Sequence, residues 1–139
     1  MYQLTTHASF DSAHFLAGYQ GKCSNLHGHR WKLEVTVSSE ELEEEGQIRG
    51  MVVDFGELKK DVKDLADEFD HCLIIETGSL KEKTMEALAE EDFRIIQVDF
   101  RPTAENFAKY FYDRMKEKEY QVCLVKVYET PNNMAGYGE

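Results

Sequence analysis

Two stretches in which apolar and polar residues alternate constrain the fold of this chain more than any other feature. Residues 31–37 alternate Trp31, Leu33, Val35 and Val37 with polar side chains, and residues 2–10 show the same parity more loosely. Successive side chains of a β-strand point to opposite faces, so this pattern predicts strands that are buried on one face. Further β-rich runs are expected as strands, and these lie at residues 48–53, 93–100 and 122–130.

Two other stretches change to a period of 3.6 residues, which is typical of amphipathic helices. The first covers about residues 55–69, with Asp54 as its expected N-cap. The second follows Thr103, its expected cap, and ends near residue 118. Residues 84–91 allow a short third helix, although their apolar stripe is weak. The order of the elements predicts an α+β fold with two helices packed on one face of a sheet.

Length and charge narrow the class of protein. With 139 residues and no repeat or linker, the chain is expected to form one domain over residues 1–139. A formal net charge of −11 argues against nucleic acid as a partner, because such binding depends on neutralising phosphates. No apolar run reaches the roughly 18 to 20 residues that span a bilayer, and no secretory signal pattern is visible, so we expect a cytoplasmic protein without a membrane partner.

Residues 12–33 contain no acidic residue but hold three of the five histidines. His27 and His29 lie two residues apart at the start of a predicted strand, so their imidazoles share one face and can converge on one metal ion. His14, just after the first strand, is the candidate third ligand. Three protein ligands with one open position are the arrangement of catalytic zinc. Solvent-facing or hydrogen-bonded histidines are the alternative.

Cys23, four residues before His27, has two interpretations. Near a metal ion the thiol can serve as a base, or it can be a fourth ligand that closes a structural zinc site. The first describes an enzyme and the second a zinc-stabilised binding module. All three cysteines are expected to be free thiols, because they are too few and too far apart for a disulfide framework. The cations of the acid-free window are candidates to bind an anionic ligand, and these are Lys22, Arg30 and Lys32.

Carboxylates near the ends of predicted elements are the remaining candidates. Asp70 and His71 follow the first helix, and in a loop Asp70 can hold the tautomer of His71 for acid–base work. Alternatively, His71 complements the negative end of the helix dipole. Glu129 ends a strand, where it can accept two parallel N–H groups of a heterocycle or lie in water. Glu105, in the first turn of the second helix, has comparable alternatives.

Six short segments, in this order, make the chain resemble the family of 6-pyruvoyl-tetrahydropterin and 6-carboxytetrahydropterin synthases. They are FDSAH at 10–14, C-SNL-HGH at 23–29, VVDFGELKK at 52–60, FDH at 69–71, PTAEN at 102–106 and YETP at 128–131. The resemblance covers most of the chain. It implies the tunnelling fold, an antiparallel sheet with two helices on one face. It also implies an oligomeric barrel made by three subunits, paired into a homo-hexamer.

The resemblance also implies roles for individual residues. It implies that His14, His27 and His29 bind Zn²⁺ and that Cys23 is the catalytic thiol. It implies that Asp70 and His71 are the partner dyad for proton transfer. Glu129 would anchor the pterin and is grouped with the proton-relay residues. Further candidates for contacts to the substrate are Thr103, Glu105 and Lys22.

The spacing of the cysteine and histidine segments separates the two main activities of the family. Three residues lie between Cys23 and His27, which resembles the bacterial 6-carboxytetrahydropterin synthases of queuosine (7-deazaguanine) biosynthesis. The implied reaction is that of a zinc-dependent lyase. It converts 7,8-dihydroneopterin triphosphate to 6-carboxy-5,6,7,8-tetrahydropterin and releases acetaldehyde and triphosphate. A 6-pyruvoyl-tetrahydropterin synthase and a non-catalytic zinc-stabilised module stay open as alternatives.

Overall fold

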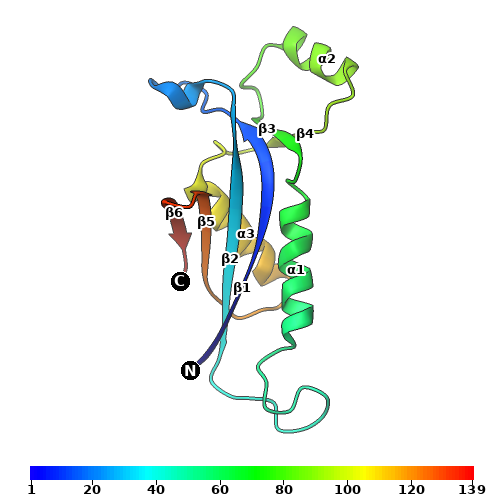
Figure 1. The fold of residues 1–139 in the computed structure, drawn as a ribbon, viewed down its shortest axis with the longest axis vertical. Coiled ribbons are helices and arrows are strands. Elements are labelled where there is room, and N and C mark those ends of the chain that lie inside the picture. Colours follow the sequence, from blue (N-terminus) through cyan, green and yellow to red (C-terminus); the bar gives the residue numbers. More distant parts are fainter.

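One curled sheet with helices on one face organises the molecule (Figure 1). The computed structural model describes residues 1–139. Its six strands have the order β4-β3-β1-β2-β5-β6. Their bounds are Tyr2–His14 for β1, His27–Ser39 for β2, Cys72–Glu76 for β3, Ile95–Val98 for β4, Val122–Thr130 for β5 and Asn133–Tyr137 for β6. β1, β2, β5 and β6 pair antiparallel, whereas β3 pairs in parallel with β1 and β4.

Two long helices cover one face of this sheet. α1 (Phe55–Asp67) packs on β1 and β2, and α3 (Ala104–Glu117) packs on β5 and β6. The short helix α2 (Glu82–Glu90) buries none of its residues and stands at one end of the molecule, beyond β3 and β4 (Figure 1). The face of the sheet opposite α1 and α3 carries no helix, and we call it the open face.

β1 and β2 pair along their full lengths, from Tyr2 opposite Ser39 to His14 opposite His27. The alternation of β2 buries Trp31, Leu33 and Val35 completely against the helices. The core of 22 buried residues lies in this layer between the sheet and the two helices. Near its centre Phe10 stacks on Trp31 at 5.8 Å between ring centroids, and Phe107 meets Trp31 edge-on at 5.3 Å. The apolar face of the sheet is therefore covered by aromatic packing.

Both predicted helix caps are confirmed. The Asp54 carboxylate accepts a hydrogen bond from the main-chain N–H of Gly56 at 2.6 Å, and the Thr103 hydroxyl accepts one from Asn106 at 3.2 Å. Each cap satisfies a donor that a helix leaves without an intrahelical partner. The weak pattern at residues 84–91 corresponds to α2. No helix in the structure has the length and apolar character needed to cross a membrane.

Several strand predictions were wrong or incomplete. Residues 48–53 form turns and bends because Gly50 adopts a φ of +80°, which interrupts an extended strand. β3 was not predicted, since a strand with neighbours on both edges and burial on both faces lacks alternation. β6 was not predicted either, because its five residues include Gly136 and lie mostly exposed at the sheet edge. The sheet is therefore mixed and not wholly antiparallel.

Candidate metal centre and active site

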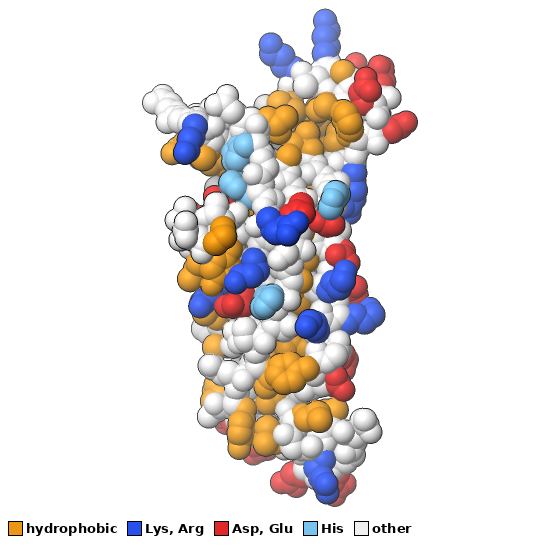
Figure 2. All heavy atoms as spheres, in the orientation of Figure 1, with side chains coloured by type: hydrophobic (Ala, Val, Ile, Leu, Met, Phe, Trp, Pro, Cys, Tyr) orange, Lys and Arg blue, Asp and Glu red, His pale blue; other side chains and the backbone are white.

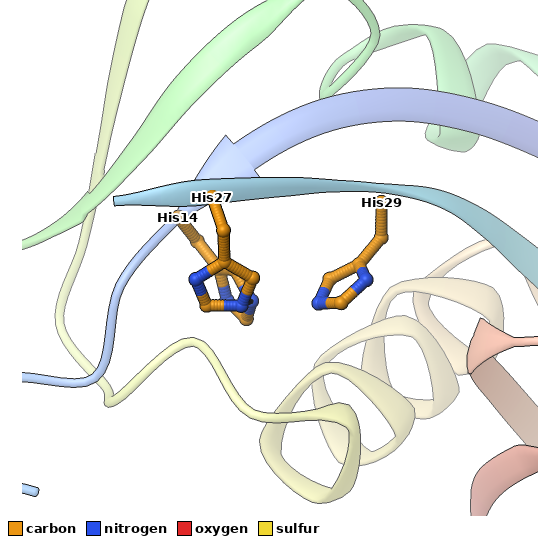
Figure 3. A group of neighbouring side chains, drawn as sticks. All are labelled: His14, His27 and His29. Carbon is orange, nitrogen blue, oxygen red and sulfur yellow. Dashed lines mark hydrogen bonds between the residues drawn. The ribbon is translucent and has the colours of Figure 1, made fainter. Parts of the chain in front are cut away.

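Three imidazoles meet where β1 ends and β2 begins. The register places His14 opposite His27, and His29 shares the parity of the buried Trp31. All three side chains therefore lie on the face of the sheet that the helices cover, directed toward the start of α3 (Figure 3). One ligand atom from each residue lies within 4.8 Å of the other two. The predicted grouping of His14, His27 and His29 is thus present as geometry.

Main-chain carbonyls fix the tautomer of two of these rings. The Nδ1–H of His14 donates to the carbonyl oxygen of Pro102 at 2.8 Å, and the Nδ1–H of His27 donates to that of Asn25 at 2.6 Å. In a neutral imidazole the other nitrogen then carries a lone pair. Both Nε2 atoms are therefore acceptors, as a metal ligand requires, and the carbonyls orient the rings in the way that outer partners of metal ligands commonly do.

The free nitrogens are arranged as if around a cation. The Nε2 atoms of His14 and His27 lie 3.1 Å apart, so two lone pairs face one another when both rings are neutral. The Nε2 atom of His29 is buried and has no hydrogen-bond partner. A buried polar atom without a partner is costly, and a metal ion is one of the few groups that satisfies three such nitrogens at once. The donor set fits Zn²⁺, for which imidazole is a common ligand.

Burial favours the neutral form of two of these imidazoles. Desolvation lowers the pKa of His14 to about 4, although the hydrogen bond to Pro102 opposes part of the shift. Desolvation also lowers the pKa of His29, and repulsion from His27 adds to the effect. Trp31 contributes to the burial, because its ring centroid lies 4.9 Å from that of His14 and 5.4 Å from that of His29. Lone pairs for a metal are therefore available at neutral pH.

Carboxylates border the metal-capable group. Glu129, at the end of β5, is half-buried. Burial raises the pKa of Glu129, the neighbouring Glu105 carboxylate raises it further, and His27 partly offsets both. Glu105 lies in the first turn of α3, two residues after the cap Thr103 and three after Pro102, whose carbonyl binds His14. The sequence segments around Thr103 and Glu129 thus lie beside the three histidines, and a half-buried carboxylate there can bind N–H donors of a ligand.

Cys23 lies in a single 3-10 turn, Lys22–Ser24, in the connection between β1 and β2. Its main-chain carbonyl accepts a hydrogen bond from the N–H of Leu16 at 2.9 Å, which ties the turn to the end of β1. The thiol is free and half-buried. The group of side chains that can hold a metal contains three imidazoles and no thiol. This geometry favours an open fourth position over a closed site of one cysteine and three histidines.

Asp70 and His71 form a hydrogen-bonded pair just after α1. The Nδ1–H of His71 donates to Oδ2 of Asp70 at 2.9 Å, and the main-chain N–H of Asp11 donates to the other carboxylate oxygen at 2.8 Å. The Asp11 N–H, followed by His71, lowers the pKa of Asp70 below its ordinary value. The His71 side chain is 78% exposed, so its second nitrogen faces solvent. Asp70 can therefore orient the ring for proton transfer.

The pair and the three histidines face opposite sides of the sheet. Asp11 alternates with the buried Phe10 and Ser12, so its side chain points to the open face, where it accepts two hydrogen bonds from Arg30 at 2.9 and 3.1 Å. The charges of Asp70 and His71 both shift the pKa of Asp11, so the pair lies near Asp11 on this face. His71 is absent from the metal-capable group. One chain thus does not bring all the predicted catalytic residues together.

The three candidate cations have different surroundings. Lys22 lies in the turn that holds Cys23. Arg30 is paired with Asp11 on the open face, and Lys32 lies there too, with its ammonium 4.1 Å from the centroid of the Tyr128 ring. None of the three belongs to the covered face that carries the histidines. No sequence signal pointed to the carbonyls of Pro102 and Asn25, because any residue type supplies a carbonyl.

The chain is similar in sequence to known proteins. A family model described as 6-pyruvoyl tetrahydropterin synthase matches residues 3–139. A 6-carboxy-5,6,7,8-tetrahydropterin synthase of Haemophilus influenzae is 35% identical over 142 residues and covers 100% of both chains. A protein of the same name from Aquifex aeolicus is 39% identical over 128 residues, which cover 85% of this chain and 76% of that one.

Solved structures share the fold. An uncharacterized protein of Wolinella succinogenes superposes with a TM-score of 0.79 at 23% identity, over 99% of this chain and 98% of the other. The 6-pyruvoyl tetrahydropterin synthase of Caenorhabditis elegans gives a TM-score of 0.70 at 24% identity, over 99% and 95% of the two chains. These likenesses confirm the predicted architecture of sheet and covering helices.

The buried His14 predicts how stability depends on pH once metal is removed. An unfolded histidine titrates near 6.5, whereas the pKa of folded His14 is about 4. Between these values the unfolded state binds a proton that the folded state does not, so the free energy of unfolding falls as pH falls from about 6.5 toward 4. We expect urea denaturation with a chelator at pH 7, 6 and 5 to show this slope, and His14→Gln to reduce it. Equal slopes in parent and variant would contradict a neutral buried His14.

Proposed function

Because the chain belongs to the 6-pyruvoyl tetrahydropterin synthase family, we propose that it is a zinc-dependent lyase of the 6-carboxytetrahydropterin synthase type. The substrate is 7,8-dihydroneopterin triphosphate, and the products are 6-carboxy-5,6,7,8-tetrahydropterin, acetaldehyde and triphosphate. Such a product serves queuosine biosynthesis. The observation that carries the proposal is the convergence of three imidazoles, without a thiol, beside a half-buried glutamate. We also propose that residues 1–139 form one such domain in the cytoplasm, as the sequence predicts.

His14, His27 and His29 are the residues that would hold the metal ion. Main-chain carbonyls fix the tautomers of His14 and His27, and the Nε2 atom of His29 is buried without a partner. Both observations support this assignment. A zinc ion bound there supplies Lewis-acid polarisation of oxygen atoms on the substrate side chain, which acidifies the adjacent C–H bonds. The three imidazoles thereby fix where on the substrate the chemistry takes place.

The other residues bind the ring and move protons. Glu129 accepts two N–H groups from the N–C–N edge of the pterin, and Thr103 and Glu105 border the same space at the start of α3. The thiol of Cys23 takes a proton from one face of the substrate side chain. His71, oriented by Asp70, donates and accepts protons on the other face. Proton transfer from both faces requires the side chain to be held within reach of the two carriers.

Carbon accounting distinguishes the proposed reaction from its alternatives. The substrate side chain has three carbons. Cleavage between the first and second, with one water molecule supplying the second carboxyl oxygen, leaves a carboxyl carbon on the ring and releases a two-carbon aldehyde. A pyruvoyl product retains all three carbons, and a binding module leaves the substrate unchanged. We expect incubation with dihydroneopterin triphosphate to yield equal amounts of acetaldehyde and a 6-carboxy product, as measured by an aldehyde assay and by mass spectrometry.

Cys23→Ala tests the assignment of the thiol in the same assay. We expect this variant to lose turnover and to keep the zinc content of the parent, because the thiol is a proton carrier and not a metal ligand. Cys123→Ala, which changes another half-buried free cysteine, is the matched control and should retain activity. A parallel loss of zinc in Cys23→Ala would instead identify Cys23 as a structural ligand.

The three histidines and the Asp70–His71 pair lie on opposite faces of the sheet. This arrangement supports a site shared between two copies of the chain. We propose the homo-hexamer, a dimer of trimers, that the family resemblance implies. Strands β4 and β6 leave unpaired edges, and the open face has no covering element. Such edges are commonly paired or covered. Hydrophobic side chains are also exposed at both ends of the molecule (Figure 2), where one groove is lined by Leu42, Met51 and Phe55 and another by Phe15, Leu26 and Leu88.

Mixing two inactive variants tests whether two copies complete each site. His29→Ala disrupts the metal-binding group, and His71→Ala removes the exposed ring, so each variant alone should lack activity. In mixed oligomers some sites combine an intact triad from one variant with an intact Asp70–His71 pair from the other. Random mixing predicts recovery of about a quarter of parental activity.

The matched control for this experiment mixes His27→Ala with His29→Ala. Neither variant has a complete triad, so their mixture should stay inactive in any arrangement of chains. If the mixture of His29→Ala and His71→Ala also stays inactive, although the subunits have exchanged, then the triad and the pair act within a single chain.

Two cations on the open face and one in the Lys22–Ser24 turn support binding of the triphosphate in spite of the net charge of −11. Arg30 lies beside Asp11, next to the exposed His71. In the proposed oligomer it therefore faces the neighbouring copy's histidine site, which His71 also serves. Lys22 and Lys32 form no ion pair and are available to an anion. We propose that these three residues supply part of the phosphate site.

Charge reversal tests this placement. We expect Lys22→Glu, Arg30→Glu and Lys32→Glu each to raise the KM for the triphosphate substrate by about tenfold, since a charge-assisted hydrogen bond contributes roughly 1.5–3 kcal/mol. Lys83→Glu, on the exposed helix α2, is the control and should leave KM unchanged. Unchanged KM values in all three variants would reject the placement.

A further inference from the structure

Arg94, the residue before β4, caps the end of α1 beside the Asp70–His71 pair. Its guanidinium donates to the main-chain carbonyl of Asp70 and to that of Glu68 at 2.8 Å, with a longer contact of 3.4 Å to that of Asp67. We propose that Arg94 is a positioning residue that holds His71 in its working conformation. The inference rests on the proposed role of the Asp70–His71 pair and adds a residue that the sequence did not suggest.

The turn that Arg94 holds has an unfavourable backbone conformation. His71 has a φ of +53°, in the left-handed region that residues with a Cβ atom rarely adopt. Such a conformation persists only where surrounding contacts determine it. On the β1 side, the N–H of His71 donates to the carbonyl of Asp11 at 2.6 Å, and the N–H of Asp11 donates to the Asp70 carboxylate at 2.8 Å. Arg94 supplies the contacts on the opposite side of the turn.

No other cation donates to the main-chain carbonyls at the end of α1. The last turn of the helix contains no basic residue, although the final carbonyls of a helix lack intrahelical partners and carry partial negative charge. Arg114 of α3 binds the Glu68 side chain through two hydrogen bonds, at 2.9 and 3.0 Å, and so anchors this residue without reaching its carbonyl. The carbonyl of Asp67 also accepts a hydrogen bond from the N–H of Asp70 at 3.3 Å, whereas those of Glu68 and Asp70 depend on Arg94.

The main chain of Arg94 is itself fixed by the sheet. Its carbonyl accepts a hydrogen bond from the N–H of Leu73 at 3.0 Å, at the point where β3 and β4 begin to pair. The guanidinium thus connects a sheet edge to the turn that presents His71. Removing it should widen the range of positions that the exposed His71 ring samples, and leave the three histidines on the other face unaffected.

The test compares Arg94→Ala and Arg94→Lys with the parent enzyme. We expect Arg94→Ala to lower kcat at least tenfold, with KM changed less than twofold and zinc content unchanged, because ring placement affects proton transfer and not substrate binding. Lysine keeps a cation near the carbonyls, so Arg94→Lys should recover a large part of kcat. Arg49→Ala, in the loop before α1 at the other end of the sheet, is the matched control and should keep parental kcat.

His71→Ala, measured alongside, separates failure of this inference from failure of the proposed function. If His71→Ala abolishes turnover while Arg94→Ala stays within twofold of parental kcat, the positioning role is wrong and the function of the pair stands. If both variants keep parental kcat, the pair itself is not catalytic. A loss of kcat, zinc and thermal stability together in Arg94→Ala, without rescue by lysine, would assign Arg94 a general structural role instead.

Discussion

The antiparallel pairing of β1 with β2 is the constraint on which both the core and the candidate site depend. The two strands pair from Tyr2 opposite Ser39 to His14 opposite His27. Because side chains alternate with a period of two, a slip of one residue in β2 would turn its buried residues to the open face. The same slip would remove His27 and His29 from the face of His14. Hydrophobic burial over the length of the strands therefore fixes the geometry of three polar residues at their end.

The sequence predicted the features that follow from local pattern. Alternation identified β2, and the caps Asp54 and Thr103 located the starts of α1 and α3. Features that depend on tertiary context were missed. β3 has no alternation because it is buried on both faces, and the tautomer of His14 is fixed by a carbonyl 88 positions away, that of Pro102. The grouping of the histidines was predictable from spacing and family segments. The side of the sheet to which His71 points depends on a turn with positive φ, which no sequence motif indicates.

The two faces of the sheet give the predicted site residues different physical environments. On the covered face, aromatic packing excludes water, and burial holds the pKa of His14 at about 4, which suits a metal ligand. On the open face, Asp70 and the largely exposed His71 remain hydrated, and Asp70 is stabilised in its ionised form by a main-chain N–H. A proton carrier benefits from such access, whereas a ligand set benefits from its absence. Under the proposed function both tasks serve one substrate, and their division between faces then places them in two copies of the chain.

The aromatic core also bears on whether the metal is structural or catalytic. Zinc modules that fold only with metal are small domains whose apolar core is insufficient by itself. Here 22 buried residues form one core, and Trp31 connects it to the histidines by packing on Phe10 and Phe107 on one side and on His14 and His29 on the other. The same apolar packing that stabilises the domain therefore also positions the rings of His14 and His29. A metal ion held by His14, His27 and His29 would thus meet ligands that the core has already positioned, which favours a catalytic over a structural role.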